Sequence, residues 1–336
     1  MSAEPIRTTT RKCMETGKPL LSILMAVYEP RLDWLREQLE SLEKQSYPNL
    51  RLYVRDDCSM TVHFQEIERL VKKCIRSFPC ELARNEENLG SNGTFERLTR
   101  EAEGEYFAYC DQDDVWLPEK LTVLQEELEQ SGALLVCSDM FIIDAEGRRV
   151  ADSITKVRRR HRFQSGEGLA ENLLISNFVT GCTMLVRSET AKAAIPFCPY
   201  MVHDHYLALW CGERGTIVSM EIPLLKYRVH RNNQTSLLAG VTDKASYGTV
   251  RIHKMLERLR WLKEHFPCGE RLEIALENRL TWAQAREGNW QHQGGKWTVW
   301  KYRRYSPVPS LFELFAPEMP EWMFRIFLRM GRKNLV

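Results

Sequence analysis

The sequence predicts an α/β fold, in which a mostly parallel central sheet is flanked by helices. Between residues 20 and 102, three apolar strands each run into polar residues and are then followed by an amphipathic helix. A strand, a helix and a further strand usually form a parallel unit, and ligands bind at the carboxyl ends of such strands. The expected strands are residues 21–28, 50–54 and 80–83, and the expected helices are residues 31–45, 62–76 and 94–102.

Local patterns support each of these elements. The run from Leu21 to Tyr28 is apolar and stops at Glu29-Pro30, and the next helix has leucines at positions 32, 35, 39 and 42. Such spacing places apolar side chains on one helix face. The third unit enters its helix through residues 84–94, which are rich in Asn and Gly and predict a loop. This loop matches neither a Walker loop nor the dinucleotide fingerprint.

The composition is that of an ordinary globular protein. The chain has 336 residues, 43% of them hydrophobic, and a formal net charge of +2, which does not single out nucleic acid as a partner. The ten cysteines show no close pair at zinc-site spacing, so we expect buried thiols in a reducing compartment. Residues 1–18 form a polar arm without the apolar core of a signal peptide, so we expect a cytoplasmic protein.

A fourth strand, residues 106–110, ends in the densest acidic cluster of the chain. Asp111, Gln112, Asp113 and Asp114 follow it directly, and a helix is expected over residues 119–130. Carboxylates at the end of a buried strand repel one another and lose solvation. A polar turn that caps the next helix is one interpretation. The other is a site for Mg²⁺ or Mn²⁺, since these cations take carboxylate oxygens and bridge substrate phosphates.

The segment up to residue 240 continues the α/β pattern. We expect strands at residues 133–137, 183–186, 216–218 and 222–225, a helix at residues 168–174, and a basic, amide-rich loop at residues 226–236. A dense basic run at residues 156–162 is either a solvated loop or an anion-binding surface. Asp204 stands at the start of an apolar helix, where it either caps the helix or serves as a general base beside His203 and His205.

The last hundred residues predict a helical region. Two amphipathic helices, broken at residues 266–269, are expected between residues 247 and 287. Beyond them, aromatic and basic residues alternate, as in residues 322–332. This pattern is typical either of an interfacial helix on anionic lipid or of a helical subdomain that packs on itself. We therefore expect a polar arm (1–18), a catalytic domain (19–240, divided at 118/119) and a helical C-terminal region (241–336) with possible membrane contact.

Four motifs in this order resemble the family 2 glycosyltransferases with the GT-A fold, and among them the bacterial rhamnosyltransferase-like branch. They are residues 22–29 (SILMAVYE), 55–59 (RDDCS), 84–90 (RNEENLG) and 111–116 (DQDDVW), and the resemblance covers about residues 20–236. The family usually has Pro where this chain has Ala26. The resemblance implies a metal-dependent, inverting transfer of a sugar, with L-rhamnose from dTDP-rhamnose as one candidate, from a nucleotide-diphosphate sugar to a glycan or lipid-linked saccharide.

The resemblance also implies roles for individual residues. Asp204 corresponds to the catalytic base, and Asp113, with Asp111 and His230, corresponds to the metal site. Contacts to phosphate or acceptor are expected from His203, Trp116 and Arg231. The nucleotide-sugar site is expected to comprise Ala26, Tyr28, Glu29, Asp56, Asp57, Arg84, Asn88, Gly90, Asp111 and Gln112.

Two other functions are compatible with the same fold class. A catalytically silent carbohydrate-binding or scaffold protein is one, because fold does not imply function. A nucleotidyltransferase is the other, since it also uses paired Asp residues and Mg²⁺, but it would need a basic, Gly-rich loop after the first strand, where this chain has residues 28–31 (YEPR).

Overall fold

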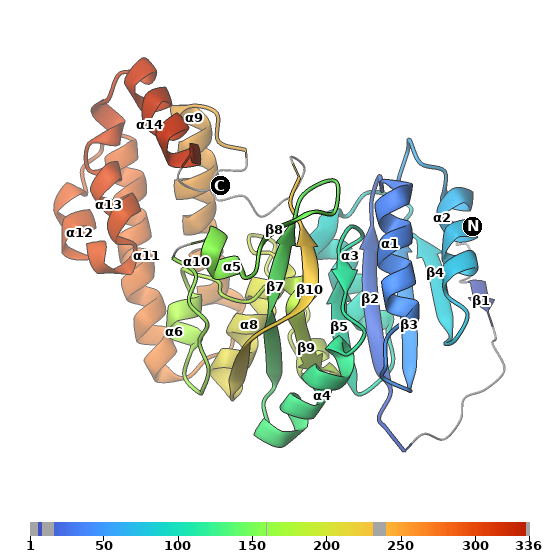
Figure 1. Ribbon diagram of the computed structural model, residues 1–336. Helices are drawn as coiled ribbons and strands as arrows, with labels where there is room; N and C mark the ends of the chain where they lie inside the picture. Colours follow the sequence, from blue (N-terminus) through green and yellow to red (C-terminus); the bar gives the residue numbers. More distant parts are fainter. Residues whose placement is uncertain (1–5, 9–16, 159, 231–239, 334–336) are drawn as a thin grey trace. The chain divides into compact units, whose positions relative to one another are not determined.

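The computed structural model describes residues 6–8, 17–158, 160–230 and 240–333 (Figure 1). The chain divides into two compact units. The first, called the sheet unit, comprises the described parts of residues 1–169, 178–197 and 202–230. The second, called the helical unit, comprises those of residues 170–177, 198–201 and 231–336. The candidate site residues that the structure describes lie in the sheet unit.

A ten-stranded sheet forms the centre of the sheet unit, in the order β1-β4-β3-β2-β5-β9-β7-β10-β6, with β8 paired to β7. The longer strands run in one direction, which confirms the predicted mostly parallel sheet. They are β2 (Leu21–Val27), β3 (Leu50–Asp56), β4 (Cys80–Arg84), β5 (Tyr106–Cys110), β7 (Leu135–Ile143) and β10 (Ile217–Arg228). Running against them are β1 (Ile6–Thr8), β6 (Val115–Trp116), β8 (Arg149–Ala151) and β9 (Met184–Arg187).

Helices cover both faces of this sheet. Alternate residues of β2, from Leu21 to Val27, pack with α1 (Leu32–Glu43), α2 (Phe64–Cys74) and α4 (Lys120–Ser131) in one apolar core. A second group of helices, α3 (Gly90–Glu101), α7 (Ser188–Ala193) and α8 (His203–Arg214), packs together through α3. The remaining short elements are α5 (Ile154–Val157) and the 3-10 turn η1 (Gly181–Thr183). Because β2, β3 and β5 are buried between helices, their polar residues are confined to the strand ends.

The structure corrects four details of the sequence prediction. Helix α3 begins at Gly90, four residues before the expected start, and Gly90 has a positive φ of 70°. Strand β7 continues to Ile143 instead of ending at Cys137. Residues 217–228 form one strand, irregular near Pro223, where two strands and part of a loop were expected. Within the expected polar arm, Ile6–Thr8 pairs antiparallel with β4.

The helical unit contains α6 (Ala170–Leu173), α9 (Lys244–Tyr247), a π-helical segment η2 (Gly248–His253), α10 (Lys254–His265), α11 (Glu270–Trp290), α12 (Lys296–Lys301), η3 (Arg303–Tyr305), α13 (Pro307–Glu313), η4 (Ala316–Glu318) and α14 (Glu321–Lys333). Its core includes Tyr247, Phe324 and Leu328. A buried ion pair joins Arg286 of α11 to Glu313 of α13 at 2.6 Å. This confirms the predicted helical C-terminal region.

Among the described helices, none has both the length and the apolar character needed to cross a bilayer.

Candidate functional site

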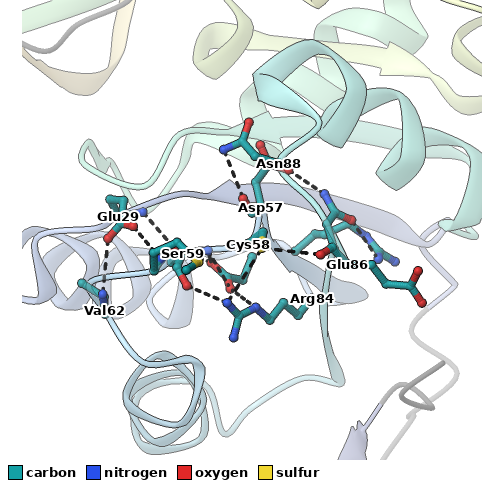
Figure 2. Close-up of polar contacts among 12 residues, drawn as sticks. Glu29, Asp57, Cys58, Ser59, Val62, Arg84, Glu86 and Asn88 are labelled. Atoms are coloured by element: carbon teal, nitrogen blue, oxygen red, sulfur yellow. Dashed lines mark hydrogen bonds and ion pairs between the residues drawn. The ribbon is translucent and has the colours of Figure 1, made fainter. Parts of the chain in front are cut away.

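The turn after β3, residues 56–59, is the first acidic turn of the site. Asp56 is fully buried, and its carboxylate accepts from the Ser59 hydroxyl at 2.5 Å and lies 3.3 Å from Nε of Arg84. Arg84, which is exposed at the end of β4, also donates to the Ser59 carbonyl at 2.6 Å (Figure 2). Burial raises the pKa of Asp56, while the Ser59 bonds and the Arg84 cation oppose that rise. The structure therefore brings Asp56 and Arg84 together, as predicted.

Asp57 organises the loop that leads into α3. Its Oδ1 accepts from Nδ2 of Asn85 and from the backbone N–H of Leu89, both at 2.8 Å. Asn88 donates to the Asp57 carbonyl at 3.3 Å and accepts from the Gly90 N–H at 3.0 Å. Asp57, Asn88 and Gly90 thus belong to one hydrogen-bonded loop beside Asp56 and Arg84 (Figure 2).

Glu29 and Gln112 hold backbone segments together at the ends of β2 and β5. The Glu29 carboxylate accepts from the backbone N–H groups of Met60, Thr61 and Val62 and from the Thr61 hydroxyl (Figure 2). These bonds lower its pKa to about 2. Gln112 pairs with Tyr28 in both directions, accepting from its N–H at 2.8 Å and donating to its carbonyl at 3.0 Å.

Ala26 and Tyr28 are two further predicted residues of the nucleotide-sugar site. Ala26 lies near the end of β2, paired with Arg55 of β3, and Tyr28 projects a side chain that is 47% exposed. The Tyr28 side chain is therefore accessible from solvent, whereas those of Glu29 and Gln112 hydrogen-bond to the backbone.

The turn after β5, residues 111–114, is the second acidic turn. Potential ligand atoms of Asp111, Asp114 and Cys182 all lie within 4.8 Å of one another. Burial, then the charge of Asp113, raises the pKa of both Asp111 and Asp114, and the pKa of Asp111 reaches about 7. The turn thus crowds its carboxyl groups together in a buried place, which disfavours their ionised forms.

Lys120 supplies part of that compensation. Its side chain is fully buried, donates to the Cys182 carbonyl at 2.5 Å and lies 3.0 Å from the ring centroid of Trp116. Burial lowers the pKa of Lys120 to about 7, while the charges of Asp111 and Asp114 favour its protonated form. Sequence reasoning missed Lys120, because a charged residue in an amphipathic helix is usually solvated.

Asp113 and His230 form the accessible part of this acidic turn. Oδ2 of Asp113 lies 2.6 Å from Nε2 of His230, and the two side chains are 18% and 15% exposed. The His230 ring also contacts the Trp34 ring of α1 in a tilted arrangement, with centroids 4.9 Å apart. The structure therefore joins two residues that were predicted to share a metal. Arg231, predicted to contact phosphate or acceptor, lies outside the described residues.

Arg228 ties the acidic turn to distant parts of the sheet unit, and sequence reasoning missed it. Its guanidinium donates to the carbonyl of Asp113 at 2.9 Å and to Glu37 of α1 at 2.5 Å, and its backbone N–H donates to Asp114 at 3.0 Å. Arg228 is 1% exposed. Only its place in the same predicted basic loop as His230 could have drawn attention to it.

Asp204 reaches the second acidic turn through η1. Its Oδ2 accepts from the backbone N–H of Gly181 at 2.9 Å, and the next residue, Cys182, lies beside Asp111 and Asp114. The Asp204 charge is close enough to raise the pKa of Asp111. Val202, not Asp204, occupies the cap position of α8, so the capping interpretation is wrong.

Two predicted ligand contacts are corrected by burial. His203 and Asp204 are both 6% exposed, but the His203 ring packs against aromatic rings, with its centroid 4.0 Å from that of Phe95 and 5.1 Å from that of Tyr109. Burial lowers its pKa to about 3, so the ring is neutral and packs in the core. Trp116 is 2% exposed, beneath Lys120. Neither side chain is placed to contact phosphate or acceptor.

The two acidic clusters of this turn differ in how well they suit a divalent cation. Asp114 is fully buried and already accepts from Arg228, burial raises the pKa of the Cys182 thiol, and Lys120 adds a positive charge beside them. These properties disfavour a cation at Asp111, Asp114 and Cys182. Asp113 and His230 are partly accessible from solvent and offer carboxylate and imidazole ligands, so this pair fits Mg²⁺ or Mn²⁺ better.

Residues 22–192, just over half of the chain, match the family described as glycosyl transferase family 2. The chain belongs to this family. It is therefore a glycosyltransferase, and the alternatives of a silent scaffold and of a nucleotidyltransferase are set aside.

Curated relatives agree at low identity. TuaG of Bacillus subtilis, a glycosyltransferase named for teichuronic acid biosynthesis, is 24% identical over 272 residues, which cover 80% of this chain and all of TuaG. The dTDP-rhamnosyl transferase RfbG of Shigella flexneri is 25% identical over 242 residues, covering 66% of this chain and 76% of RfbG.

Solved structures of glycosyltransferases share the fold. S. aureus TarS, residues 1–349, in complex with UDP-GlcNAc, aligns with a TM-score of 0.54 at 16% identity, covering 88% of this chain and 81% of TarS. The mannosyltransferase PcManGT of Pyrobaculum calidifontis, in complex with GDP-Man and Mn²⁺, also has a TM-score of 0.54, at 15% identity, covering 95% of this chain and 81% of that one. The predicted GT-A fold is confirmed.

Proposed function

We propose that this family 2 glycosyltransferase is a metal-dependent, inverting enzyme that moves a sugar from a nucleotide-diphosphate donor to a glycan or a lipid-linked saccharide. The observation that carries this proposal is the connection of Asp204, through Gly181 and Cys182, to the acidic turn that holds Asp111 and Asp113. A base and a diphosphate site must adjoin for inversion, because the acceptor attacks opposite the departing diphosphate.

Asp204 would act as the general base of this reaction. As the acceptor oxygen forms its bond to the anomeric carbon, the bond to the leaving diphosphate breaks and the hydroxyl proton passes to the Asp204 carboxylate. The hydrogen bond from Gly181 at 2.9 Å fixes the orientation of that carboxylate. A Cβ on Gly181 would lie 2.7 Å from Nε2 of His203, so only glycine allows this close approach.

Asp113, His230 and Asp111 would hold Mg²⁺ or Mn²⁺. When bound, the cation would supply positive charge to the diphosphate of the donor. Arg228 holds the Asp113 backbone in place for it, and the His230 ring packs against Trp34. PcManGT, which shares the fold, was solved with GDP-Man and Mn²⁺.

The nucleotide would bind at the first acidic turn. Asp56, Arg84, Asp57, Asn88 and the exposed ring of Tyr28 lie at the carboxyl ends of β2, β3 and β4 and at the entry to α3. Carboxylates there can accept from ribose hydroxyls and base N–H groups, and an exposed aromatic ring can stack on a base. Ala26 would lie beneath this site, with Glu29, Gly90 and Gln112 shaping its backbone.

The names of relatives suggest the donor and the acceptor. RfbG is named a dTDP-rhamnosyl transferase, and WfgD of Escherichia coli, 24% identical over 220 residues, is named for glucosyl transfer to GlcNAc-diphosphoundecaprenol. We therefore propose dTDP-L-rhamnose as the first donor to test and a saccharide on a lipid carrier as the acceptor, in cell-surface polysaccharide synthesis. Such an acceptor would place the enzyme in the cytoplasm, in peripheral contact with the inner face of the cell membrane.

The experiment that tests this proposal is a panel of nucleotide sugars incubated with purified protein, with Mn²⁺, with Mg²⁺ or with EDTA. Release of nucleoside diphosphate is measured, and the anomeric configuration of any product is determined by NMR. We expect release from one donor, dependent on the cation and lost in Asp113→Ala. Asp152→Asn, an exposed carboxylate of the same unit, is the matched control.

Release that survives both EDTA and Asp113→Ala would overturn the metal-dependent mechanism. Retention of the donor's anomeric configuration in the product would overturn the inverting one.

A further inference from the structure

Helix α14 of the helical unit has two apolar faces, and only one of them is packed. Phe324 is fully buried and Leu328 is 7% exposed, in a core that they share with Tyr247. Trp322, Ile326 and Met330 recur every four residues, about half a turn from that pair, and they are 66%, 46% and 56% exposed. A solvated helix normally presents charged or polar residues on this outer face.

Helix α13 and the residue that follows it extend this exposed surface. The Phe312 ring contacts Phe324 and Phe327, with centroids 5.5 and 6.0 Å apart, so α13 lies beside α14. Next to Phe312, Leu311 is 42% exposed, and four residues later Phe315 is 64% exposed. The surface formed by Leu311, Phe315, Trp322, Ile326 and Met330 is called the α13–α14 face below. Figure 1 shows both helices in the red part of the chain.

The charges around this face are predominantly positive. Arg325 and Arg329 are exposed and lie one turn apart on α14, beside the apolar residues, and Arg325 also forms an exposed ion pair with Glu321 at 3.0 Å. On the preceding segment, the Arg303 guanidinium lies 4.0 Å from the ring centroid of the exposed Trp300, and Arg304 and Lys301 are close in sequence. Between residues 291 and 333 the sequence has eight Lys and Arg residues against three Asp and Glu.

We infer that the α13–α14 face docks on the surface of an anionic lipid bilayer. Exposed Trp, Phe and Ile side chains would enter the boundary between headgroups and acyl chains, while the arginines would remain among the phosphates. The positive charge of this face favours a bilayer over a second copy of the chain. A second copy would present the same positive surface and be repelled, whereas an anionic bilayer offers the complementary charge and an apolar interior. The inference rests on the proposed peripheral location and names the surface that produces it.

Co-sedimentation with vesicles tests this inference on the full chain. One vesicle preparation contains equal parts of phosphatidylglycerol and phosphatidylcholine, and the other contains phosphatidylcholine alone. We expect binding to the anionic vesicles that weakens as salt is raised, and much weaker binding to the neutral ones. The double variant Trp322→Ala/Ile326→Ala should lower the partition coefficient at least about tenfold, since two large apolar side chains no longer enter the bilayer.

Matched variants separate this surface from general effects. Ile274→Ala removes an equally exposed apolar residue from α11 and should leave binding unchanged. Arg325→Gln/Arg329→Gln should weaken binding to anionic vesicles about tenfold, whereas Lys254→Gln/Arg271→Gln, also exposed, should weaken it much less. Circular dichroism of each variant confirms that the helices are retained.

Several outcomes would overturn the inference. One is equal binding by the wild type and Trp322→Ala/Ile326→Ala, and another is no binding to anionic vesicles. A third is sedimentation velocity showing a dimer that the double variant abolishes, which would assign the face to self-association. Donor hydrolysis in detergent-free buffer without lipid should be the same in all these variants. Loss of vesicle binding with hydrolysis intact therefore contradicts only the docking surface, and loss of hydrolysis in the wild type contradicts only the proposed chemistry.

Discussion

The turn after β3 and the turn after β5 both place carboxylates at one edge of the sheet, but their surroundings differ. Asp56 lies against the Arg84 guanidinium and Ser59, and Asp57 is bonded to Asn85 and Leu89. In the second turn, Asp111 and Asp114 lie within 4.8 Å of each other and of Cys182, and like charges add to burial in raising their pKa values. The carboxylates of the first turn have a cation and hydrogen-bond donors as close partners, whereas those of the second are crowded against one another, and their raised pKa values reflect a repulsion that a bound cation would relieve.

Under the proposed function, this contrast would let one edge of the sheet serve two purposes. A turn whose hydrogen bonds are satisfied keeps its shape without a ligand, which suits recognition of a nucleotide. A turn whose carboxylates repel one another is stabilised when a cation binds between them, which suits a site for a metal and a diphosphate.

The largest effect is expected at the base linked to the second turn. Asp204→Asn preserves shape and removes the proton acceptor, so kcat for sugar transfer should fall by about 10²–10⁴-fold, with the KM for the donor little changed. Steady-state kinetics with the identified donor measure this. Asp152→Asn should keep wild-type kinetics, and a kcat for Asp204→Asn within about twofold of wild type would exclude Asp204 as the base.

Lys120→Met should destabilise the protein at the second acidic turn. Removing the buried ammonium leaves Asp111 and Asp114 without their internal counter-charge, so the free energy of unfolding in EDTA should fall by ~3–5 kcal/mol. Urea denaturation monitored by circular dichroism measures the loss. Lys192→Met, at an exposed position of α7, should change it by less than about 0.5 kcal/mol. Equal stability of the two variants would mean that Lys120 does not balance the acidic turn.

Asn85→Ala, beside the first acidic turn, should lower the free energy of unfolding by less than Lys120→Met does. Asn85 is 2% exposed and donates to Asp57 at 2.8 Å and to Thr94 at 2.9 Å, so its removal leaves a buried carboxylate oxygen with one bond fewer. We expect a loss of ~1–3 kcal/mol in the free energy of unfolding. Asn88→Ala, at an exposed position of the same loop, should cost less than Asn85→Ala in the same urea titration. The reverse order would show that Asn85 is not the anchor of this loop.

Glu29→Gln should give the smallest change in stability, and the lowered pKa of Glu29 sets the sign of its pH dependence. The folded pKa of Glu29, about 2, lies below its ordinary value of 4.5, so its contribution to stability is fully present above about pH 4.5 and is lost as the pH falls toward 2. The difference in melting temperature between wild type and Glu29→Gln should therefore be constant from neutral pH down to about 5 and shrink below it. A difference that grows as the pH falls would contradict this role.

Much of the sheet unit could be predicted from the sequence, because its buried strands are continuous apolar runs that end in polar residues. Strand β5 has the expected bounds, 106–110, and β2, β3 and β4 are within one or two residues of theirs. The start of α3 could not be read from residues 88–93, because Asn, Ser and Gly favour loops in general. Here Gly90 adopts a positive φ and the helix begins at once.

The candidate site was predictable where residues are close in sequence and much less so where they meet through the fold. The turns at Asp56 and Asp111 are local motifs, whereas the contact of Arg228 with Glu37 joins residues 191 positions apart. His203 stands next to Asp204 in the sequence, yet successive helix positions point about 100° apart, and its ring faces Phe95. The position of His203 next to Asp204 in the sequence therefore led to the wrong role for His203. No neighbouring residue in the sequence indicated the long-range contacts of Arg228.

The most direct test of the two-turn account is Mn²⁺ binding in the presence of a nucleoside diphosphate, measured by the loss of the free-Mn²⁺ electron paramagnetic resonance signal. The account predicts one site in the wild type, its loss in Asp113→Ala and His230→Ala, and its retention in Asp152→Asn. Asp56→Asn should bind Mn²⁺ once the nucleotide concentration is raised. Wild-type Mn²⁺ binding by Asp113→Ala, or its loss in Asp56→Asn at every nucleotide concentration, would contradict the division of roles between the two turns.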